Sequence, residues 1–473
     1  MILRVALFVA LVGLLAGCGV AIPYLESESS DQPAEPAHTQ PRAKAKPKKR
    51  PSRVKVYVVS VDGDTGRRVR SAVARVAGQR DRANRKGLST LRIRRLAPLP
   101  VRVTAPGYLG RTVRVPFQKR RQNTVRIYRR NLQWPMYGVT PQRTQAQSRI
   151  RLRPPFRVVW SRGIGSLIEF PAVVSEGVAY IANQKGTVYA ISMRFGKTIW
   201  RFHTPRGKMA ASPAVVGDQI VVHGMEGNVW VLDRASGRLR WRYHVGSPIE
   251  SSPIVRHGVD YFGAWNGVVY ALDLKHHRLR WTHRTGFKIT SSAAIAGRRL
   301  YIGDYGGYVR SIAIRNGRLA WARSVGGRIY GTPALASGRV FVPSSTGGSL
   351  TAFSTGGRYL WRVGTGSYVY SSPATQGGRV FFGSYNGRLY GVNARTGRVL
   401  WSVGTGGPVS GAAVVVDRVA YAGSTHGSIV GADTRSGRVL FRFPHGEYVP
   451  VSGNGSRLLL HGYSRLYAVA PRK

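Results

Sequence analysis

The residue types that catalyse reactions or bind metal ions are sparse and scattered in this chain. It has 473 residues, including 11 histidines and 1 cysteine. His276 and His277 are adjacent, but neighbours on an extended strand point to opposite faces. No His-Glu-x-x-His, no Gly-x-Ser-x-Gly and no phosphate-binding glycine loop with Lys-Ser/Thr occurs in the sequence. The sequence therefore predicts no catalytic residue and no metal site.

Two carboxylates in one turn are the nearest approach to a cation site. Asp62 and Asp64 lie in the segment Asp-Gly-Asp-Thr-Gly, and carboxylates at such spacing can bind calcium. Because no third acidic residue accompanies them, turn formation is the preferred interpretation. The same holds for Asp233, Asp273 and Asp433, which occupy a recurring turn position.

Basic residues greatly outnumber acidic ones. Lys and Arg total 73 and Asp and Glu total 19, so the net charge is +54. Such a charge attracts anionic polymers, anionic lipid and nucleic acid. Many of the arginines directly follow a recurring turn glycine, which indicates repeat composition: Arg238, Arg318, Arg358, Arg398 and Arg438. No nucleic-acid motif is present, so we expect no specific nucleic-acid binding.

The first 18 residues have the features of an export signal. Arg4 precedes an apolar run, and small residues lead to Cys18. Leu15-Ala16-Gly17-Cys18 resembles the bacterial lipoprotein box, which implies that Cys18 is lipidated and becomes the first mature residue. An uncleaved anchor is an alternative, since about 20 apolar residues span a bilayer, and ordinary cleavage is a third. All three predict an exported protein, and the first two attach it to a membrane, facing the periplasm or the cell exterior.

Two regions precede the main part of the chain. Residues 19–52 are rich in Pro and Lys and predict a disordered linker. Residues 53–130 contain short alternating runs between turn signals, which are typical of a β-sandwich. The segment 101–108, Val-Arg-Val-Thr-Ala-Pro-Gly-Tyr, resembles the carboxypeptidase regulatory-like (transthyretin-like) domain. That resemblance implies a spacer or an adhesive module.

An aromatic residue recurs about every 40 residues over the rest of the chain. The series is Trp160, Trp200, Trp241, Trp281, Trp321, Trp361, Trp401 and Phe441. A glycine stands four residues before the aromatic in every later unit except one, which has His277. Small residues such as Ser-Pro-Ala begin several units. Each unit therefore predicts four short strands separated by glycine turns, which is one blade of a β-propeller.

The two ends of the repeat region predict how the ring closes. The C-terminal unit supplies only three strands, and the segment 156–160 can supply the fourth. This pairing leaves no open sheet edge. The predicted fold class is all-β: an eight-bladed propeller of four-stranded blades over residues 153–473, preceded by a connector at 131–152 and the small β-sandwich. We expect the propeller to be monomeric.

Seven units resemble the PQQ-type (quinoprotein-type) propeller repeat. The segment 390–401, Tyr-Gly-Val-Asn-Ala-Arg-Thr-Gly-Arg-Val-Leu-Trp, shows the pattern, and the leader Trp134–Gly138 is similar to the segment before such propellers. The resemblance implies that the repeat aromatics dock between blades and are structural. Quinoprotein dehydrogenases of this type hold PQQ beside a pair of adjacent cysteines, with calcium. The chain has no cysteine pair, so we expect neither PQQ nor enzymatic activity.

The same repeat and a lipoprotein box occur in envelope lipoproteins of the outer-membrane assembly type, which bind a partner through loops on one propeller face. The residues before each inner strand would surround one mouth of the channel, and Glu169, Glu250, Tyr330 and Tyr370 are the candidate binding residues there. We predict a non-enzymatic binding or scaffold protein on the outer face of a bacterial membrane, with an envelope protein or polymer as partner. Electrostatic attachment to anionic envelope polymers or lipid is the alternative, and a PQQ-dependent dehydrogenase is less favoured.

Overall fold

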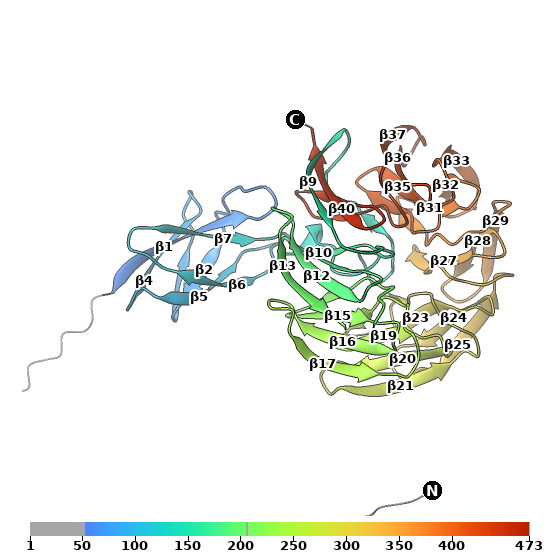
Figure 1. Cartoon of the computed structure of the whole chain (residues 1–473), viewed down its shortest axis with the longest axis horizontal. Coiled ribbons are helices and arrows are strands. Elements are labelled where there is room, and N and C mark those ends of the chain that lie inside the picture. The colour runs from blue at the N-terminus through green and yellow to red at the C-terminus, as the bar shows by residue number, and fades with distance from the viewer. Residues whose placement is uncertain (1–52, 205–206, 473) are drawn as a thin grey trace, which may run out of the picture. The chain divides into compact units, whose positions relative to one another are not determined.

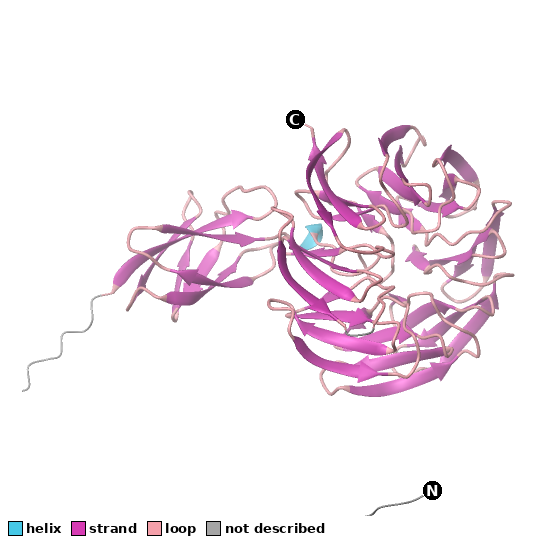
Figure 2. Ribbon diagram, viewed as in Figure 1, coloured by secondary structure: helices cyan, strands magenta, loops and turns pink. Residues whose placement is uncertain are grey.

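The computed structural model describes residues 53–204 and 207–472, and nearly every regular element in them is a strand (Figures 1 and 2). The exception is the short 3-10 helix η1 (Arg130–Leu132). Among the described residues, no helix has the length and apolarity needed to span a membrane. Cys18, the predicted export signal and the predicted linker lie outside the described residues.

Residues 53–130 form two sheets that enclose an aliphatic core. One sheet has the order β4 (Leu88–Ile93), β1 (Val54–Asp62), β7 (Gln122–Ile127). The other has the order β3 (Gln79–Arg82), β2 (Val73–Val76), β5 (Pro98–Thr104), β6 (Arg111–Pro116). Val58, Leu91 and Val103 are among the buried side chains between them. This is a small β-sandwich, as the alternating pattern predicts.

Eight sheets follow one another around a ring, seven with four strands and that of blade 7 with a fifth, β8 (Ala146–Gln147), added to its inner strand (Figure 1). Blades 1 to 8 begin with the inner strands β10 (Val173–Ser175), β14 (Ala214–Val216), β18 (Ile254–Arg256), β22 (Ala294–Ala296), β26 (Ala334–Ala336), β30 (Ala374–Gln376), β34 (Val414–Val416) and β38 (Val451–Gly453). The second strands are β11 (Val178–Ala182), β15 (Gln219–His223), β19 (Val259–Gly263), β23 (Arg299–Gly303), β27 (Arg339–Ser344), β31 (Arg379–Ser384), β35 (Val419–Ser424) and β39 (Leu458–His461).

The two outer positions complete each blade. The third strands are β12 (Thr187–Ser192), β16 (Asn228–Asp233), β20 (Val268–Asp273), β24 (Tyr308–Ala313), β28 (Ser349–Ser354), β32 (Arg388–Asn393), β36 (Ser428–Asp433) and β40 (Arg465–Pro471). The outer strands of blades 1 to 7 are β13 (Thr198–His203), β17 (Leu239–His244), β21 (Arg278–Arg284), β25 (Leu319–Ser324), β29 (Tyr359–Gly364), β33 (Val399–Gly404) and β37 (Val439–Phe443).

The outer strand of blade 8 comes from before blade 1. It is β9 (Phe156–Gly163), which pairs antiparallel with β40, Ala468 lying opposite Trp160. Phe156 also packs against Phe441 of blade 7, with ring centroids 5.3 Å apart. The predicted closure of the ring, and with it the predicted all-β fold class, is confirmed.

The repeat aromatics lie on the outer strands and contact the next blade. The indole N–H of Trp160 donates to the carbonyl of Met193 at 3.0 Å, and Trp361 donates to Ala394 at 3.2 Å. Trp200, Trp281, Trp321 and Trp401 make the matching donations in four other blades. The recurring glycine lies under the ring: a Cβ at Gly196 would come within 2.7 Å of Trp160, and its φ is +67°. Glycine is therefore required there by both contact and backbone conformation.

A belt of hydroxyl groups joins the inner strands. The Ser252 hydroxyl accepts from the backbone N–H of Ser212 at 3.0 Å, and Ser292 accepts in the same way from Ser252 at 2.8 Å. Thr332 and Ser372 continue the belt. Each bond links residues 40 positions apart, which explains the small polar residue that begins many units: it satisfies a buried N–H of the preceding blade.

The segment before β9 passes across the inner strands of the ring. Its β8 (Ala146–Gln147) pairs parallel with β34, and the carbonyls of Pro135 and Pro141 accept from Val215 and Ile295. Arg143 is fully buried within it. Its guanidinium donates to the carbonyls of Ala293, Ser252 and Pro253 at 2.8, 3.0 and 3.1 Å, and also to Tyr137. The predicted connector thus packs as part of the propeller interior.

Candidate functional site

A cavity of about 140 Å³ lies at the ring axis and contains all four residues that the repeat register places at a channel mouth: Glu169, Glu250, Tyr330 and Tyr370. These residues precede inner strands of blades 1, 3, 5 and 6 and are half-buried. Tyr137, from the segment that crosses the inner strands, also lines the cavity and is buried. The remaining lining includes Phe170, Thr290, Ser410 and Tyr448. We call this space the axial cavity.

The two carboxylates of the axial cavity accept hydrogen bonds from neutral groups. The Glu250 Oε2 accepts from the Trp265 indole at 3.1 Å, and Glu169 accepts from the Gln184 amide. Burial raises the pKa of Glu250 to about 7, and the charge of Glu169 acts in the same direction. Burial also raises the pKa of Glu169. The charge of Lys288 opposes this rise at Glu250, although Lys288 makes no ion pair with it. Burying carboxylates without a direct ion pair is costly, so the cavity favours a positively charged group or a proton.

Aromatic rings form an arc beside these carboxylates. Ring centroids are 4.5 Å apart for Tyr305 and Tyr330, 4.9 Å for Tyr330 and Tyr370, and 4.8 Å for Tyr370 and Tyr385. With Trp265 these four tyrosines are here called the aromatic arc. The repeat register predicted only Tyr330 and Tyr370. The other three share a different repeat position, two residues before the turn glycines Gly267, Gly307 and Gly387, and this signal could have revealed them.

Cationic side chains already rest on the aromatic arc. The Lys288 Nζ lies 3.2 Å from the centroid of the Trp265 ring and 5.0 Å from that of Tyr305. The Arg328 guanidinium lies 5.8 Å from the Tyr305 centroid. Such geometry is that of cation–π interactions. The aromatic faces at this mouth are thus positioned to bind cations.

The axial cavity does not fit PQQ with its calcium ion. Pockets for cofactors and drug-sized ligands hold about 300–1,000 Å³, which exceeds the axial cavity. Within residues 53–204 and 207–472 there is no cysteine, and no three His, Cys, Asp or Glu side chains are grouped so that they could hold a metal ion. The acids that the sequence assigned to turns do lie in turns: Asp233 Oδ1, for example, accepts from the backbone of Ala235 and Ser236.

His223 has the partners of a catalytic histidine but lies in the interior. Its Nε2 lies 2.9 Å from Asp260 Oδ2, and its Nδ1 lies 2.6 Å from the backbone carbonyl of Ser251. Both His223 and Asp260 are fully buried. A substrate therefore has no access to the pair, which instead joins blades 2 and 3.

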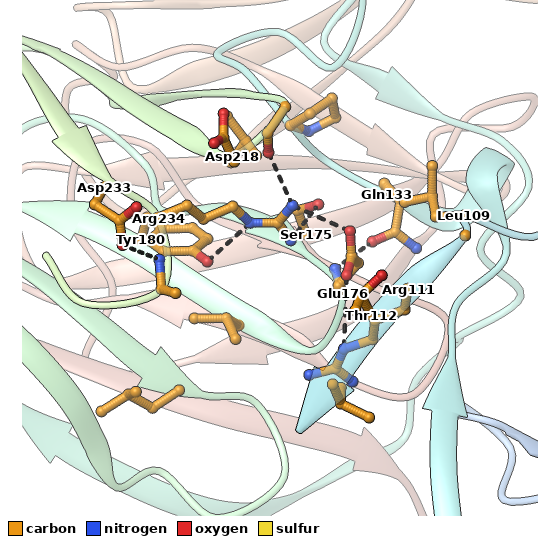
Figure 3. Close-up of a pocket in the computed structure, with 18 of the residues that line it drawn as sticks. Leu109, Arg111, Thr112, Gln133, Ser175, Glu176, Tyr180, Asp218, Asp233 and Arg234 are labelled. Atoms are coloured by element: carbon orange, nitrogen blue, oxygen red, sulfur yellow. Dashed lines mark hydrogen bonds and ion pairs between the residues drawn. The ribbon is translucent and has the colours of Figure 1, made fainter. Parts of the chain in front are cut away.

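A second hollow, of about 790 Å³, is lined by residues of β6, the connector and blades 1 and 2 (Figure 3). Glu176 lies at its centre, with Arg234 at 3.0 Å and Arg111 at 3.7 Å. Arg234 also donates to the Tyr180 hydroxyl at 3.2 Å. The Glu176 carboxylate is thus already paired with two arginines, unlike the carboxylates of the axial cavity, which accept from neutral groups.

Comparisons with known proteins agree with the propeller architecture. A family model described as outer membrane protein assembly factor BamB matches residues 184–345 and 325–447, more than half of the chain. The BamB of Bordetella pertussis is 29% identical over 97 residues, which are 20% of this chain and 25% of that protein. The BamB of Xanthomonas campestris is 25% identical over 121 residues, 22% of this chain and 30% of that protein. The aligned part thus spans less than a third of either relative.

Solved structures share the fold at low sequence identity. BamB from Moraxella catarrhalis superposes with a TM-score of 0.58 at 18% identity, covering 67% of this chain and 99% of that one. Quinohemoprotein alcohol dehydrogenase from Comamonas testosteroni superposes with a TM-score of 0.63 at 14% identity, covering 72% and 80%. These likenesses show the fold alone. With the family match over blades 1 to 7, they establish that the chain belongs to the PQQ-like β-propeller family of outer membrane protein assembly factor BamB.

Proposed function

We propose that this protein is a non-enzymatic binding scaffold of the cell envelope and that it binds a protein partner through the propeller face where the axial cavity opens. That face is formed by the loops between second and third strands and by the loops from each outer strand to the next inner strand. Because consecutive strands are antiparallel, these loops emerge on one side of the ring. We call it the cavity face.

The observation that carries the proposal is the gathering of aromatic residues on the cavity face. Four of them are among the exposed large side chains, from Tyr308 at 38% to Tyr463 at 58%, with Phe287 and Tyr368 between. Two of them extend this cluster: Tyr368 packs against Tyr370 of the aromatic arc, with ring centroids 5.7 Å apart, and Phe287 packs against Tyr308 at 6.5 Å. Lys288 and Arg328 lie over rings of the arc. Tyr, Trp and Arg dominate the energetics of protein–protein interfaces, and exposed aromatic clusters are uncommon on surfaces without partners.

The names of the relatives support an envelope location. Proteins called outer membrane protein assembly factor match part of this chain, and we propose that this chain is likewise exported. Cys18 would tether it through a lipid, with the sandwich as a spacer between membrane and propeller. Mass spectrometry of the mature full-length protein tests this: a diacylglyceryl-modified N-terminal Cys18 is expected, and an unprocessed N-terminus would refute lipidation.

Site-specific crosslinking of the full-length chain tests the partner-binding face. A photo-crosslinking amino acid is placed at Tyr368 or Phe287, on the cavity face, and at Phe195 as the control. Phe195 is 61% exposed and lies in a turn on the opposite face. The proposal expects both cavity-face positions to capture the same discrete envelope protein at low and high salt, and Phe195 not to capture it. Equal capture from all three positions would contradict it.

Electrostatic attachment is the second candidate, and the charge of +54 favours it. Exposed arginines such as Arg201, Arg284 and Arg442 lie on the outer strands. Binding of this kind weakens steeply with salt. Release of the protein from isolated envelopes by salt alone, with no crosslinked partner, would favour this alternative over the scaffold.

A further inference from the structure

We infer that the axial cavity binds a small organic ammonium group, held between the Glu169 and Glu250 carboxylates and the surrounding aromatic rings. This site is separate from the proposed partner interface, since it lies inside the ring and needs no protein partner. Three features of the described structure support it: the charge, the aromatic lining and the size of the cavity.

The charge of the cavity is opposite to that of the whole molecule. Glu169 and Glu250 line it, whereas the chain carries +54. Among the described residues, neither carboxylate makes an ion pair with a lysine or arginine; their partners are Gln184 and Trp265. A bound monocation would offset the repulsion between the two carboxylates and the cost of their burial.

The aromatic lining is suited to a weakly hydrated cation. Tyr330, Tyr370, Phe170 and Tyr448 line the cavity together with Tyr137. Aromatic rings bind alkylammonium groups by cation–π attraction, and cages of such rings recognise quaternary ammonium. The chain provides its own example at the mouth, where the Lys288 ammonium lies 3.2 Å from the centre of the Trp265 ring, which donates to Glu250.

The size and the available ligands favour an organic cation over a metal ion. A volume of about 140 Å³ leaves room for a small organic cation, and it is below the about 300–1,000 Å³ of pockets for drug-sized ligands. Calcium takes 6–8 oxygen ligands, while the described residues contain no group of three acidic or other metal-binding side chains. The ammonium can belong to a free amine or to a choline or ethanolamine headgroup, because both present the same chemistry.

Calorimetric titration of the full-length protein with choline tests the inference. The neutral isostere 3,3-dimethyl-1-butanol is the ligand control. Choline is expected to bind, and the isostere to bind at least about tenfold more weakly, because it lacks the charge that the carboxylates and rings attract. Equal binding of the two, or no binding of choline, would overturn the inference.

Matched variants locate the site. Glu250→Gln and Glu169→Gln should each weaken choline binding about tenfold or more. Glu226→Gln is the control, because Glu226 also accepts from an indole, that of Trp230 at 2.6 Å, but does not line the axial cavity. Tyr330→Phe keeps the ring and should keep binding, whereas Tyr330→Leu should lose it. An equal loss in Glu226→Gln, or full binding by Tyr330→Leu, would contradict the assignment.

A vesicle experiment distinguishes the two sources of the ammonium. The protein is added to phosphatidylcholine and to phosphatidylglycerol vesicles, with and without free choline. If the protein binds phosphatidylcholine vesicles, free choline competes with this binding and Glu250→Gln abolishes it, the ligand is a lipid headgroup. Choline binding to the free protein without any competition at vesicles assigns a free ammonium compound. Both results support the site, and choline-insensitive binding together with an inactive calorimetric titration refutes it.

Discussion

The imidazole of His277 stacks on the indole of Trp241, with ring centroids 4.3 Å apart and planes inclined by 29°. In the blades on either side a glycine occupies this turn, as Gly317 does beneath Trp281. His277 adopts the same left-handed backbone conformation, with φ at +55°. Its side chain replaces the glycine contact with a ring–ring contact, so the one unit that lacks the turn glycine still covers the ring of its tryptophan.

The docking predicts that glycine is required for space as well as for conformation. Gly317→Ala should lower the free energy of unfolding by about 2–4 kcal/mol, because a Cβ there would lie 2.7 Å from the Trp281 ring in a strained backbone region. Chemical denaturation measures the change. Gly297→Ala is the control, since its φ is +56° but no atom lies within 4 Å of its Cβ. Equal losses would mean that backbone strain alone accounts for the glycine.

The hydroxyl belt predicts a dependence of stability on one oxygen atom per blade. Ser292→Ala should destabilise the propeller by about 1–3 kcal/mol, because the buried N–H of Ser252 loses its acceptor. Thr332 holds the equivalent position in the next blade, so Ser292→Thr should retain most of the stability. Chemical denaturation of both variants measures the change. An unchanged free energy of unfolding in Ser292→Ala would show that the hydrogen bond from Ser252 to Ser292 does not stabilise the propeller.

The burial of Arg143 indicates that the connector is an integral part of the ring. Burial lowers the pKa of its guanidinium to about 10, so the group stays charged at neutral pH. Removing it leaves several buried carbonyls without donors. Arg143→Ala should therefore cost about 3 kcal/mol or more and expose residues 134–147 to proteolysis. Arg149→Ala is the control, because Arg149 is exposed in the same connector. Unchanged protease resistance in Arg143→Ala would contradict this role.

The burial of His461 leads us to expect a loss of stability in mild acid. Burial lowers its pKa to about 4, and its Nε2 accepts from the backbone of Ala172 at 3.1 Å. A histidine in the unfolded chain takes up a proton near pH 6.5, whereas the folded state does not until about pH 4. Stability should therefore fall as the pH drops from about 6.5 to 4, by up to about 3 kcal/mol. Denaturation across this range should show a shallower decline in His461→Gln, and equal slopes would exclude His461 as the cause.

The repeat alone was sufficient to predict the blades. Trp160 to Phe441 recur every 40 or 41 residues, so the local sequence of each blade encodes the same strands and turns. The register also carried Glu169, Glu250, Tyr330 and Tyr370 to one mouth, because residues at one repeat position occupy one height in the ring. The fourth strand of blade 8 followed from the shortage of strands at the C-terminus.

Contacts that do not follow the 40-residue repeat could not be predicted from the sequence. Residues 134–147 resemble no blade, and only the closed ring shows that they cross the inner strands and bury the charged Arg143. The same holds for Glu250 beside Trp265 and for Lys288 over that ring. Local sequence determines strands, turns and repeat number, because these depend on near neighbours. The tertiary structure alone determines which side chains meet at the ring axis and how deeply they are buried from solvent, because both depend on all eight blades closing together.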